Sequence, residues 1–216
     1  MLLASLLGEI TCIPETHSAR DAITVRQAIG RLRPLRDGEI DSSDPLHRAS
    51  KLSEQNKRRI VATPKNGGGA KSWPPALVPK CYKRKSGHSF MATVYGRMRW
   101  DQPAPTMTTH CITLGTGRFG HPSQNRAISL REAARFQSFP DYYEFEDPRK
   151  IRTTRVAKQI GNAVPVLLGR VIAKSIRKHI NSRMARPHIT TPIRAADTDP
   201  RASSHIRLIS APANTH

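Results

Sequence analysis

Glycine, lysine and serine are combined in one short segment, PKNGGGAKS, at residues 64–72. Nucleotide-binding phosphate loops use these residue types, because glycine lets backbone N–H groups cradle phosphates while lysine supplies positive charge. Such a loop needs glycine directly before the lysine and a strand before the loop, whereas here Ala70 precedes Lys71. We therefore expect a flexible basic loop near a phosphate backbone rather than a nucleotide site.

Cysteine and histidine fall close together in two stretches, Cys81 with His88 and Cys111 with His121. Neither stretch has the short two-ligand spacing of structural zinc sites. The remaining cysteine, Cys12, leaves the three thiols too few and too scattered for a disulfide framework. We expect unpaired buried thiols and no metal site.

Arginines and threonines follow one another in YGRMRWDQPAPTMTTHC, residues 95–111. Arg97 and Arg99 alternate on a strand-like run, so both side chains can point to one face. After a rigid turn, three threonines that begin at Thr106 could offer hydroxyls to phosphates or base edges. An ordinary exposed strand with solvated arginines explains the same pattern equally well.

The segment QIGNAVPV, residues 159–166, has the composition of a turn that leads directly into a helix. Gly161 lets the backbone bend, Asn162 can cap a helix N-terminus, and Pro165 suits the first helical turn. The apolar side chains that share one face of the helix are Val164, Leu167, Leu168, Val171, Ile172, Ile176 and Ile180. The turn is either a well-made helix start or one wall of a ligand site.

The elements that must position these residues are short and separated by Pro, Asp and Gly turns. Helical patches are predicted within 24–32, 51–62 and 129–139, the last opening with the capping-box spacing of Ser129 and Glu132. Strand-like runs occupy 90–100 and 106–114, and the apolar opening 1–10 fits a buried strand. Residues 63–87 are predicted to be mostly loop.

The charge balance indicates a polyanionic partner. Lys and Arg outnumber Asp and Glu 36 to 16 in 216 residues, which gives a formal charge of +20. The basic residues are spread along the chain, which favours a broad surface for nucleic acid. A membrane is the weaker alternative, because no long apolar run occurs and the mean hydropathy is −0.52. We expect a cytoplasmic protein of one or two domains.

Taken together, these segments resemble the C-terminal part of bacterial DNA (cytosine-5-)-methyltransferases of restriction-modification type. Residues 121–145 look like the ninth conserved motif of that family and residues 158–176 like the tenth. Residues 44–69 and 95–109 look like its target recognition domain, so the resemblance covers roughly residues 1–180.

The resemblance implies an α+β fold, in which a loop-rich recognition domain is followed by C-terminal helices. These helices would complete an α/β S-adenosylmethionine-dependent methyltransferase core that is itself mostly missing. The implied domains are a residual core strand at 1–24, the recognition domain at 25–125, the motif helices at 126–181 and a disordered basic tail at 182–216.

The resemblance also implies the ligands and the residues that hold them. S-adenosylmethionine is the cofactor, and the positions that match the pocket-lining turn are Asn162, Ala163 and Val164. Double-stranded DNA is the partner, and Thr106 resembles the recognition-domain threonine that contacts DNA near the target base. Charge and position add Arg97, Arg99 and Arg118 as expected DNA contacts. Such an enzyme is expected in the bacterial cytoplasm, associated with the nucleoid.

The motifs that carry catalysis in this family do not occur in the sequence. These are the Gly-rich cofactor loop, the Pro-Cys nucleophile, the Glu-Asn-Val segment and the Gln-Arg-Arg segment; no cysteine here follows a proline. We therefore expect no catalytic residue in this chain, no methyl transfer by the chain alone, and a complementary chain with the N-terminal motifs as a partner. The alternatives are a stand-alone sequence-specific DNA-binding module and an inactive truncated remnant.

Overall fold

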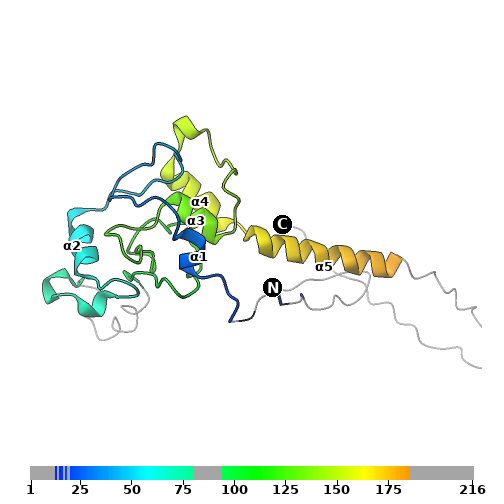
Figure 1. The fold of residues 1–216 in the computed structure, drawn as a ribbon, viewed down its shortest axis with the longest axis horizontal. Helices are drawn as coiled ribbons and strands as arrows, with labels where there is room; N and C mark the ends of the chain where they lie inside the picture. Colours follow the sequence, from blue (N-terminus) through cyan, green and yellow to red (C-terminus); the bar gives the residue numbers. More distant parts are fainter. Residues whose placement is uncertain (1–12, 14, 17, 19, 80–93, 185–216) are drawn as a thin grey trace, which may run out of the picture.

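The fold is an arrangement of helices joined by long loops (Figure 1). The structure, a computed structural model, describes residues 13, 15, 16, 18, 20–79 and 94–184. The helices are α1 (Val25–Ile29), α2 (Glu54–Ala62), α3 (Leu130–Phe136), α4 (Thr153–Asn162) and α5 (Val166–Met184), and the short 3-10 helices are η1 (Ala70–Ser72), η2 (Pro75–Leu77) and η6 (Pro148–Lys150). The strand predicted at 1–10 and the tail after residue 184 lie outside the described residues.

Side-chain caps set the start of α1, α2 and α3, and the sequence predicts the one at α3. In α1, Thr24 accepts a hydrogen bond from the Gln27 N–H while the Gln27 side chain accepts one from Thr24, which forms a complete capping box. Ser129 and Glu132 form the same box at α3. Ser53 caps α2 through the Asn56 N–H. The predicted helices within 24–32, 51–62 and 129–139 are confirmed, although each is shorter than its range.

The strands predicted over 90–100 and 106–114 are wrong for the part of those runs that the structure describes. Isolated bridges replace a ladder, at Arg97–Gly120, Gly120–Ala127 and Ile40–Arg48. Successive N–H groups bond different neighbours: Arg97 donates to the Gly68 carbonyl, and Met98 donates to that of Gly120. A sheet needs repeated pairing with one partner. The expected α+β class is therefore matched only in its helices within the described residues.

Helix α4 corrects the interpretation of residues 159–166. Gly161 and Asn162 are the last two residues of α4, so Asn162 does not cap the following helix. The chain turns after them, and α5 begins at Val166. Buried residues of α4 at 156, 157 and 160 recur at helical spacing, and this pattern is the signal that could have located the helix.

The core lies where α1, α3 and α4 meet, with α3 in contact with both of the others. Its buried residues include Val25 and Ile29 of α1, Leu130, Ala133 and Ala134 of α3, Val156, Ala157 and Ile160 of α4, and Met98, Met107 and Cys111 of the loops. A smaller cluster joins α2 to the loops through Leu52, Ile60, Leu114 and Ala127. The long loops are thus held by apolar side chains from both clusters.

Helix α5 extends away from this core (Figure 1). His179 is its only buried residue, whereas Leu167 and Leu168 are 47% and 45% exposed. The predicted helix is confirmed, but its apolar face is not covered by the described body. Among the described residues, no helix combines the length and the apolar content that crossing a bilayer would need.

Candidate functional site

Two neighbouring cavities contain most of the residues that the sequence singles out. The smaller has a volume of about 650 Å³ and the larger about 890 Å³. Pro103 and Pro105 line both cavities, so the segment 103–105 is their common wall. We refer to the smaller as the basic cavity and to the larger as the apolar cavity.

The basic cavity brings together the glycine-rich loop and the three predicted arginines, Arg97, Arg99 and Arg118. Lys71, Arg99 and Arg118 line it, and no Asp or Glu is among its described lining residues. Arg118 is held by hydrogen bonds from Nη2 to the Gly67 carbonyl at 2.7 Å and to the Arg97 carbonyl at 3.3 Å. Burial, and then the charge of Arg99, lower the pKa of Arg118, so the two cations act on one another.

Arg97 also lines the basic cavity, but its guanidinium is buried and bonded inside the protein, a geometry that does not favour the predicted DNA contact. Its side chain is 1% exposed, and its five hydrogen bonds end on the carbonyls of Thr63, His121, Gln124 and Ile60 and on Oδ1 of Asn125. Burial lowers the pKa of Arg97 to about 10. All five donors of a guanidinium are thereby used inside the protein.

A buried ion pair supports the loop that receives the Arg97 side chain. Arg126 and Glu132 are bonded twice, at 2.7 and 2.8 Å, and are 0% and 1% exposed. Burial raises the pKa of Glu132, but hydrogen bonds from Arg126 and its charge outweigh burial and lower it. The sequence identified Glu132 as a capping residue only. Its shared use by Arg126 could not be inferred from the capping-box spacing.

His121 lies beside this pair as a neutral acceptor. Its Nδ1 accepts hydrogen bonds from the backbone N–H groups of Ser123 and Gln124, at 3.2 and 3.0 Å. Burial lowers the pKa of His121 to about 4, against the charge of Glu132, which raises it. His121 therefore shapes the 121–126 loop and is not a metal ligand in this geometry.

The apolar cavity brings together Thr106 and Ala163, which lie 57 positions apart in the sequence. Its lining is mainly apolar and includes Met107, Phe136 and the start of α5. Asn162 and Val164 are exposed and do not line the cavity. The structure thus places one of the three expected cofactor residues in the cavity wall and the other two beside it, on the same turn.

Gln137, which the sequence reasoning missed, holds this turn in place. Its Nε2 donates to the carbonyls of Ile160 and Ala163 at 3.0 and 3.1 Å, and its own carbonyl accepts from Val166 at 3.0 Å. The next residue, Ser138, has a φ of 57° and accepts from the Leu167 N–H through Oγ. The end of α4, the turn and the start of α5 are therefore tied to the end of α3.

Gly161 brings the loop that carries Thr106 against α4. A Cβ atom at Gly161 would lie 2.3 Å from the carbonyl carbon of Thr108, a distance that side chains do not tolerate. Gly161 is therefore needed for this close approach. The sequence suggested a different reason, namely that the glycine lets the backbone bend sharply.

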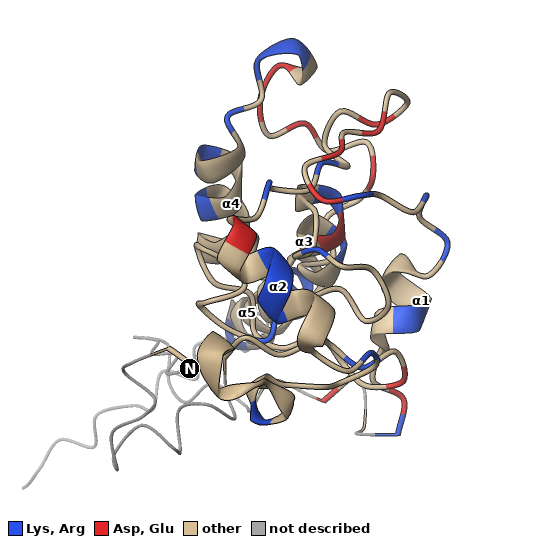
Figure 2. Cartoon of the chain, turned by 90° about the vertical axis from the view of Figure 1, so that its left-hand side faces the viewer, with Lys and Arg blue, Asp and Glu red and all other residues tan. Residues whose placement is uncertain are grey.

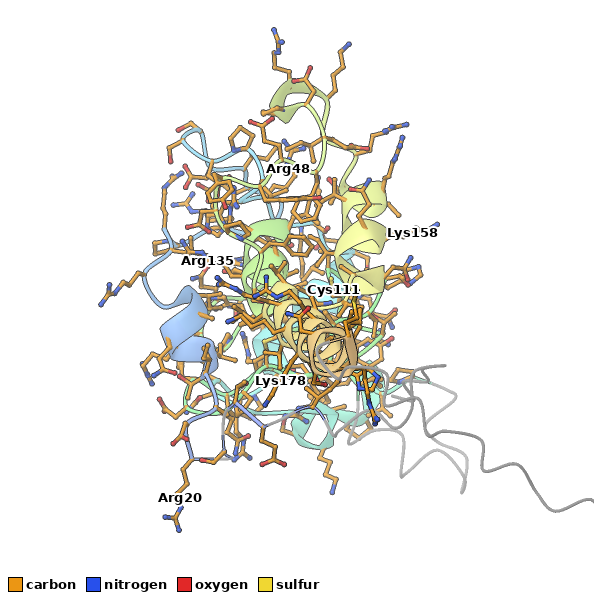
Figure 3. The ribbon with its side chains drawn as sticks, turned by 90° about the vertical axis from the view of Figure 1, so that its right-hand side faces the viewer. Arg20, Arg48, Cys111, Arg135, Lys158 and Lys178 are labelled. Atoms are coloured by element: carbon orange, nitrogen blue, oxygen red, sulfur yellow. The ribbon has the colours of Figure 1, made fainter. Side chains whose placement is uncertain are left out.

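Cys111 is the only cysteine within the described residues, and it is 0% exposed. Figure 3 shows it in the interior of the body. Burial raises the pKa of its thiol to about 11, so the nucleophilic thiolate is not formed near neutrality. No group of three or more His, Cys, Asp or Glu residues that could hold a metal ion occurs in the described part; Cys12, Cys81 and His88 lie outside it.

Basic residues are not confined to the basic cavity. Figure 2 shows Lys and Arg positions on both α2 and α4 as well as in the loops. Several of them are paired on the surface, such as Arg26 with Asp101 at 2.7 Å and Arg135 with Asp141 at 2.6 Å. The basic cavity differs from these sites because its cations face one another without an acidic residue in the described lining.

Comparisons with known proteins agree on one family. A family model described as C-5 cytosine-specific DNA methylase matches residues 13–178. The Type II methylase M.HgiDII of Herpetosiphon aurantiacus is 47% identical over 189 residues, 88% of this chain and 53% of the relative. The Type II methyltransferase M1.BsuMI of Bacillus subtilis (strain 168) is 42% identical over 130 residues, 60% of this chain and 29% of the relative.

A plant protein is also similar. DNA (cytosine-5)-methyltransferase 3 of Arabidopsis thaliana is 31% identical over 187 residues, which cover 75% of this chain and 13% of the relative. The chain spans about half the length of the first of these three relatives and smaller shares of the other two.

Proposed function

This chain belongs to the C-5 cytosine-specific DNA methylase family, and we propose that it supplies the part that recognises duplex DNA and closes the S-adenosylmethionine site. In this proposal, residues 25–125 form the target recognition domain and residues 126–181 the motif helices. The reaction served is methylation of cytosine at C5 in a restriction-modification system, at the nucleoid of a bacterial cell. The observation that supports it is that Thr106 and Ala163 line one cavity.

The lining of the apolar cavity fits one side of an adenosyl group. Met107, Phe136 and Leu167 offer apolar surface, and about 890 Å³ is within the range of small-molecule sites. When bound, S-adenosylmethionine supplies the methyl group. On this chain, Ala163 would contact the cofactor from the cavity wall. Asn162 and Val164, which are exposed beside the cavity, would contact it from the rim of the cavity. The two Gln137 hydrogen bonds would keep that rim in position.

These 216 residues do not supply the nucleophile of this reaction. In this family a thiolate attacks C6 of a cytosine that has been extruded from the duplex, which requires an activated cysteine close to the base. These 216 residues contain no Pro-Cys pair, and Cys111 is buried with a raised pKa. We propose a complementary chain that carries the Pro-Cys and Gly-rich motifs and covers the exposed apolar start of α5, Leu167 and Leu168.

A stand-alone DNA-binding module is the second candidate. The basic cavity favours it, because Lys71, Arg99 and Arg118 all come from this chain. A binding module would need no partner to hold DNA and would leave the apolar cavity without a role.

Reconstitution tests the proposal against this alternative. The purified chain should transfer no tritiated methyl group to duplex DNA, and a chain with the catalytic motifs should transfer little. Their mixture should be active, and a mixture in which the partner's Pro-Cys cysteine is alanine should not. Transfer by the 216-residue chain alone would contradict the proposed division of roles. Binding to DNA without restored transfer would favour the stand-alone module.

A further inference from the structure

The basic cavity is lined by several cationic residues, whereas the lining of the apolar cavity is mainly apolar. Lys71 of η1, Arg99 and Arg118 reach it from three separate segments of the chain. Lys71 and Arg99 are exposed, and Arg118 is partly buried. The nearest acidic residue in sequence, Asp101, is bonded to Arg26 at 2.7 Å and is not part of the described lining. The described lining of the basic cavity therefore contains these three cations and the backbone of the buried Arg97, and it contains no Asp or Glu.

Two glycines make room for the arginine side chains. Gly67 has a φ of +104°, and a Cβ there would lie 2.4 Å from Cγ of Arg99. A Cβ at Gly96 would lie 2.7 Å from Cζ of Arg118. Each arginine side chain thus passes close to a glycine, where a Cβ atom would displace it. Arg118 is held in addition by its hydrogen bonds to the Gly67 and Arg97 carbonyls, whereas Arg99 is exposed.

The electrostatics of the cavity favour an anion. Like charges held close together repel, and the charge of Arg99 contributes to the lowered pKa of Arg118. The Arg99 guanidinium makes no hydrogen bond or ion pair with the described residues, so its donors are available. A negatively charged ligand between the two would offset the repulsion and use those donors.

We propose that the basic cavity seats one phosphate group of the DNA backbone, held by Arg99, Arg118 and Lys71, and that this contact positions the duplex without reading its sequence. The proposal rests on duplex DNA as the partner in the proposed function. A phosphate fits better than a base edge, because Nη2 of Arg118 is already used on the Gly67 and Arg97 carbonyls. Base readout of guanine by arginine uses a complete two-donor fork.

Salt dependence distinguishes a phosphate contact from general basic charge. Loss of one phosphate contact reduces the slope of log affinity against log salt by about 0.9. We expect a reduction of up to this size for Arg99→Gln and for Lys71→Gln in the 216-residue chain, because both side chains serve the same phosphate. The advantage of the wild type should then shrink by up to about threefold between about 50 and about 200 mM salt. Duplexes of unrelated sequence should respond alike.

A control and a conservative variant complete this comparison. Arg149→Gln removes the same charge from an exposed side chain of η6 that is outside the cavity lining, and the slope should not change. Arg99→Lys keeps a point charge and should keep the slope, because a phosphate accepts an ammonium group as well. A loss of preference for one base pair in Arg99→Lys would show base readout and overturn the proposal.

A pair of glycine variants tests the seat with the net charge unchanged. Gly67→Ala places a methyl group against Arg99 and should reduce the slope as Arg99→Gln does. Gly69→Ala is the matched control, because its Cβ would lie 3.6 Å from Nη1 of Arg118, an ordinary contact. Thermal melts separate displacement of Arg99 from unfolding. If Gly67→Ala unfolds, the glutamine variants decide the question, since they leave the backbone unaltered.

The outcomes also separate this proposal from the proposed function. A steep wild-type slope that survives in both Arg99→Gln and Lys71→Gln would overturn the phosphate seat alone. A wild-type chain that does not bind duplex DNA would overturn the seat and the DNA-recognition part of the proposed function together. Restored methyl transfer combined with unchanged slopes would contradict the seat and leave the proposed function in place.

Discussion

The charge of Arg97 is stabilised by the dipoles of four backbone carbonyls and one asparagine side chain, rather than by an acidic side chain. Its hydrogen bonds tie the end of α2, through Ile60 and Thr63, to the 121–125 loop. A buried guanidinium of this kind is costly to insert, and its loss would strand the acceptors around it. The residue therefore stabilises the fold at the place where the sequence suggested a DNA contact.

Replacement of Arg97 by methionine should destabilise the chain strongly. Each buried acceptor left without a partner costs ~1–3 kcal/mol, so the free energy of unfolding should fall by roughly 3 kcal/mol or more. Denaturant titration measures this change. Arg99→Met, at an exposed position two residues away, is the control and should change it by less than about 0.5 kcal/mol. Equal effects of the two variants would contradict the structural role of Arg97.

His121 makes the stability of the fold sensitive to acid. Its pKa is about 4 in the folded chain and near 6.5 when unfolded, so between these values the unfolded state binds a proton that the folded state does not. The stabilisation is complete above pH 6.5 and is lost as the pH falls toward 4. The lost stability should amount to about 3 kcal/mol.

The asparagine variant of His121 isolates this effect. Asn retains an acceptor near the position of Nδ1 but has no proton to gain, so denaturant titrations should show a flatter profile between pH 6.5 and 4. His110→Asn, at an exposed site, should keep the wild-type profile. An unchanged profile in His121→Asn would show that other groups cause the acid sensitivity.

At the scale of elements, the predictions that held depend on neighbouring residues. The capping box of Ser129 and Glu132 could be predicted because its two members lie three positions apart. The predicted strands failed because strand pairing depends on distant chain segments, and here each segment meets several neighbours in turn. The expectation that Arg97 and Arg99 point to one face was wrong for the same reason. Without a regular strand, one side chain points inward and the other outward.

The end of α4 was misassigned because asparagine and proline favour helix starts, while glycine and asparagine also favour helix ends. Sequence alone could not decide between these possibilities at Gly161. The contact that decides it involves Thr108, which lies 53 residues earlier. The same limitation applies to the meeting of Thr106 and Ala163 in one cavity.

Two helical glycines give a matched test of this contact. Gly161→Ala places a Cβ 2.3 Å from the Thr108 backbone, so the chain should lose stability by about 2 kcal/mol as α4 and the loop separate. Gly169→Ala meets nothing within 4 Å in α5 and should stabilise that helix by about 0.5–1 kcal/mol. Thermal melts and helical circular dichroism measure both. Equal shifts in the same direction would contradict the proposed packing.

At the scale of the whole molecule, α5 is the element whose apolar side chains Leu167 and Leu168 remain exposed. Exposed apolar side chains at the rim of a cavity are typical of surfaces that associate. We expect Leu167→Ser combined with Leu168→Ser to leave the melting temperature of the chain within a few degrees, since neither side chain is buried. The same double variant should weaken association with the complementary chain by at least about tenfold.

Analytical ultracentrifugation of the mixture measures this association, and Arg170→Ser combined with Lys174→Ser provides a control on exposed polar positions of α5. Tight binding of the leucine variant to the complementary chain would show that the partner covers a different surface. A large drop in melting temperature of the isolated chain would show instead that the leucines support the fold itself.

The wall shared by the two cavities has a mechanical consequence. Pro103 and Pro105 face both sides, and each proline ring fixes its own φ near −65°. A cavity wall with so few rotatable backbone torsions is stiff, so a displacement on one side of it is passed to the other side. If a DNA phosphate occupies the basic cavity and the cofactor occupies the apolar cavity, this short stiff segment sets the distance between the phosphate and the methyl donor. A duplex bound one nucleotide out of register would then place an adjacent nucleotide, and not the target cytosine, next to the methyl donor.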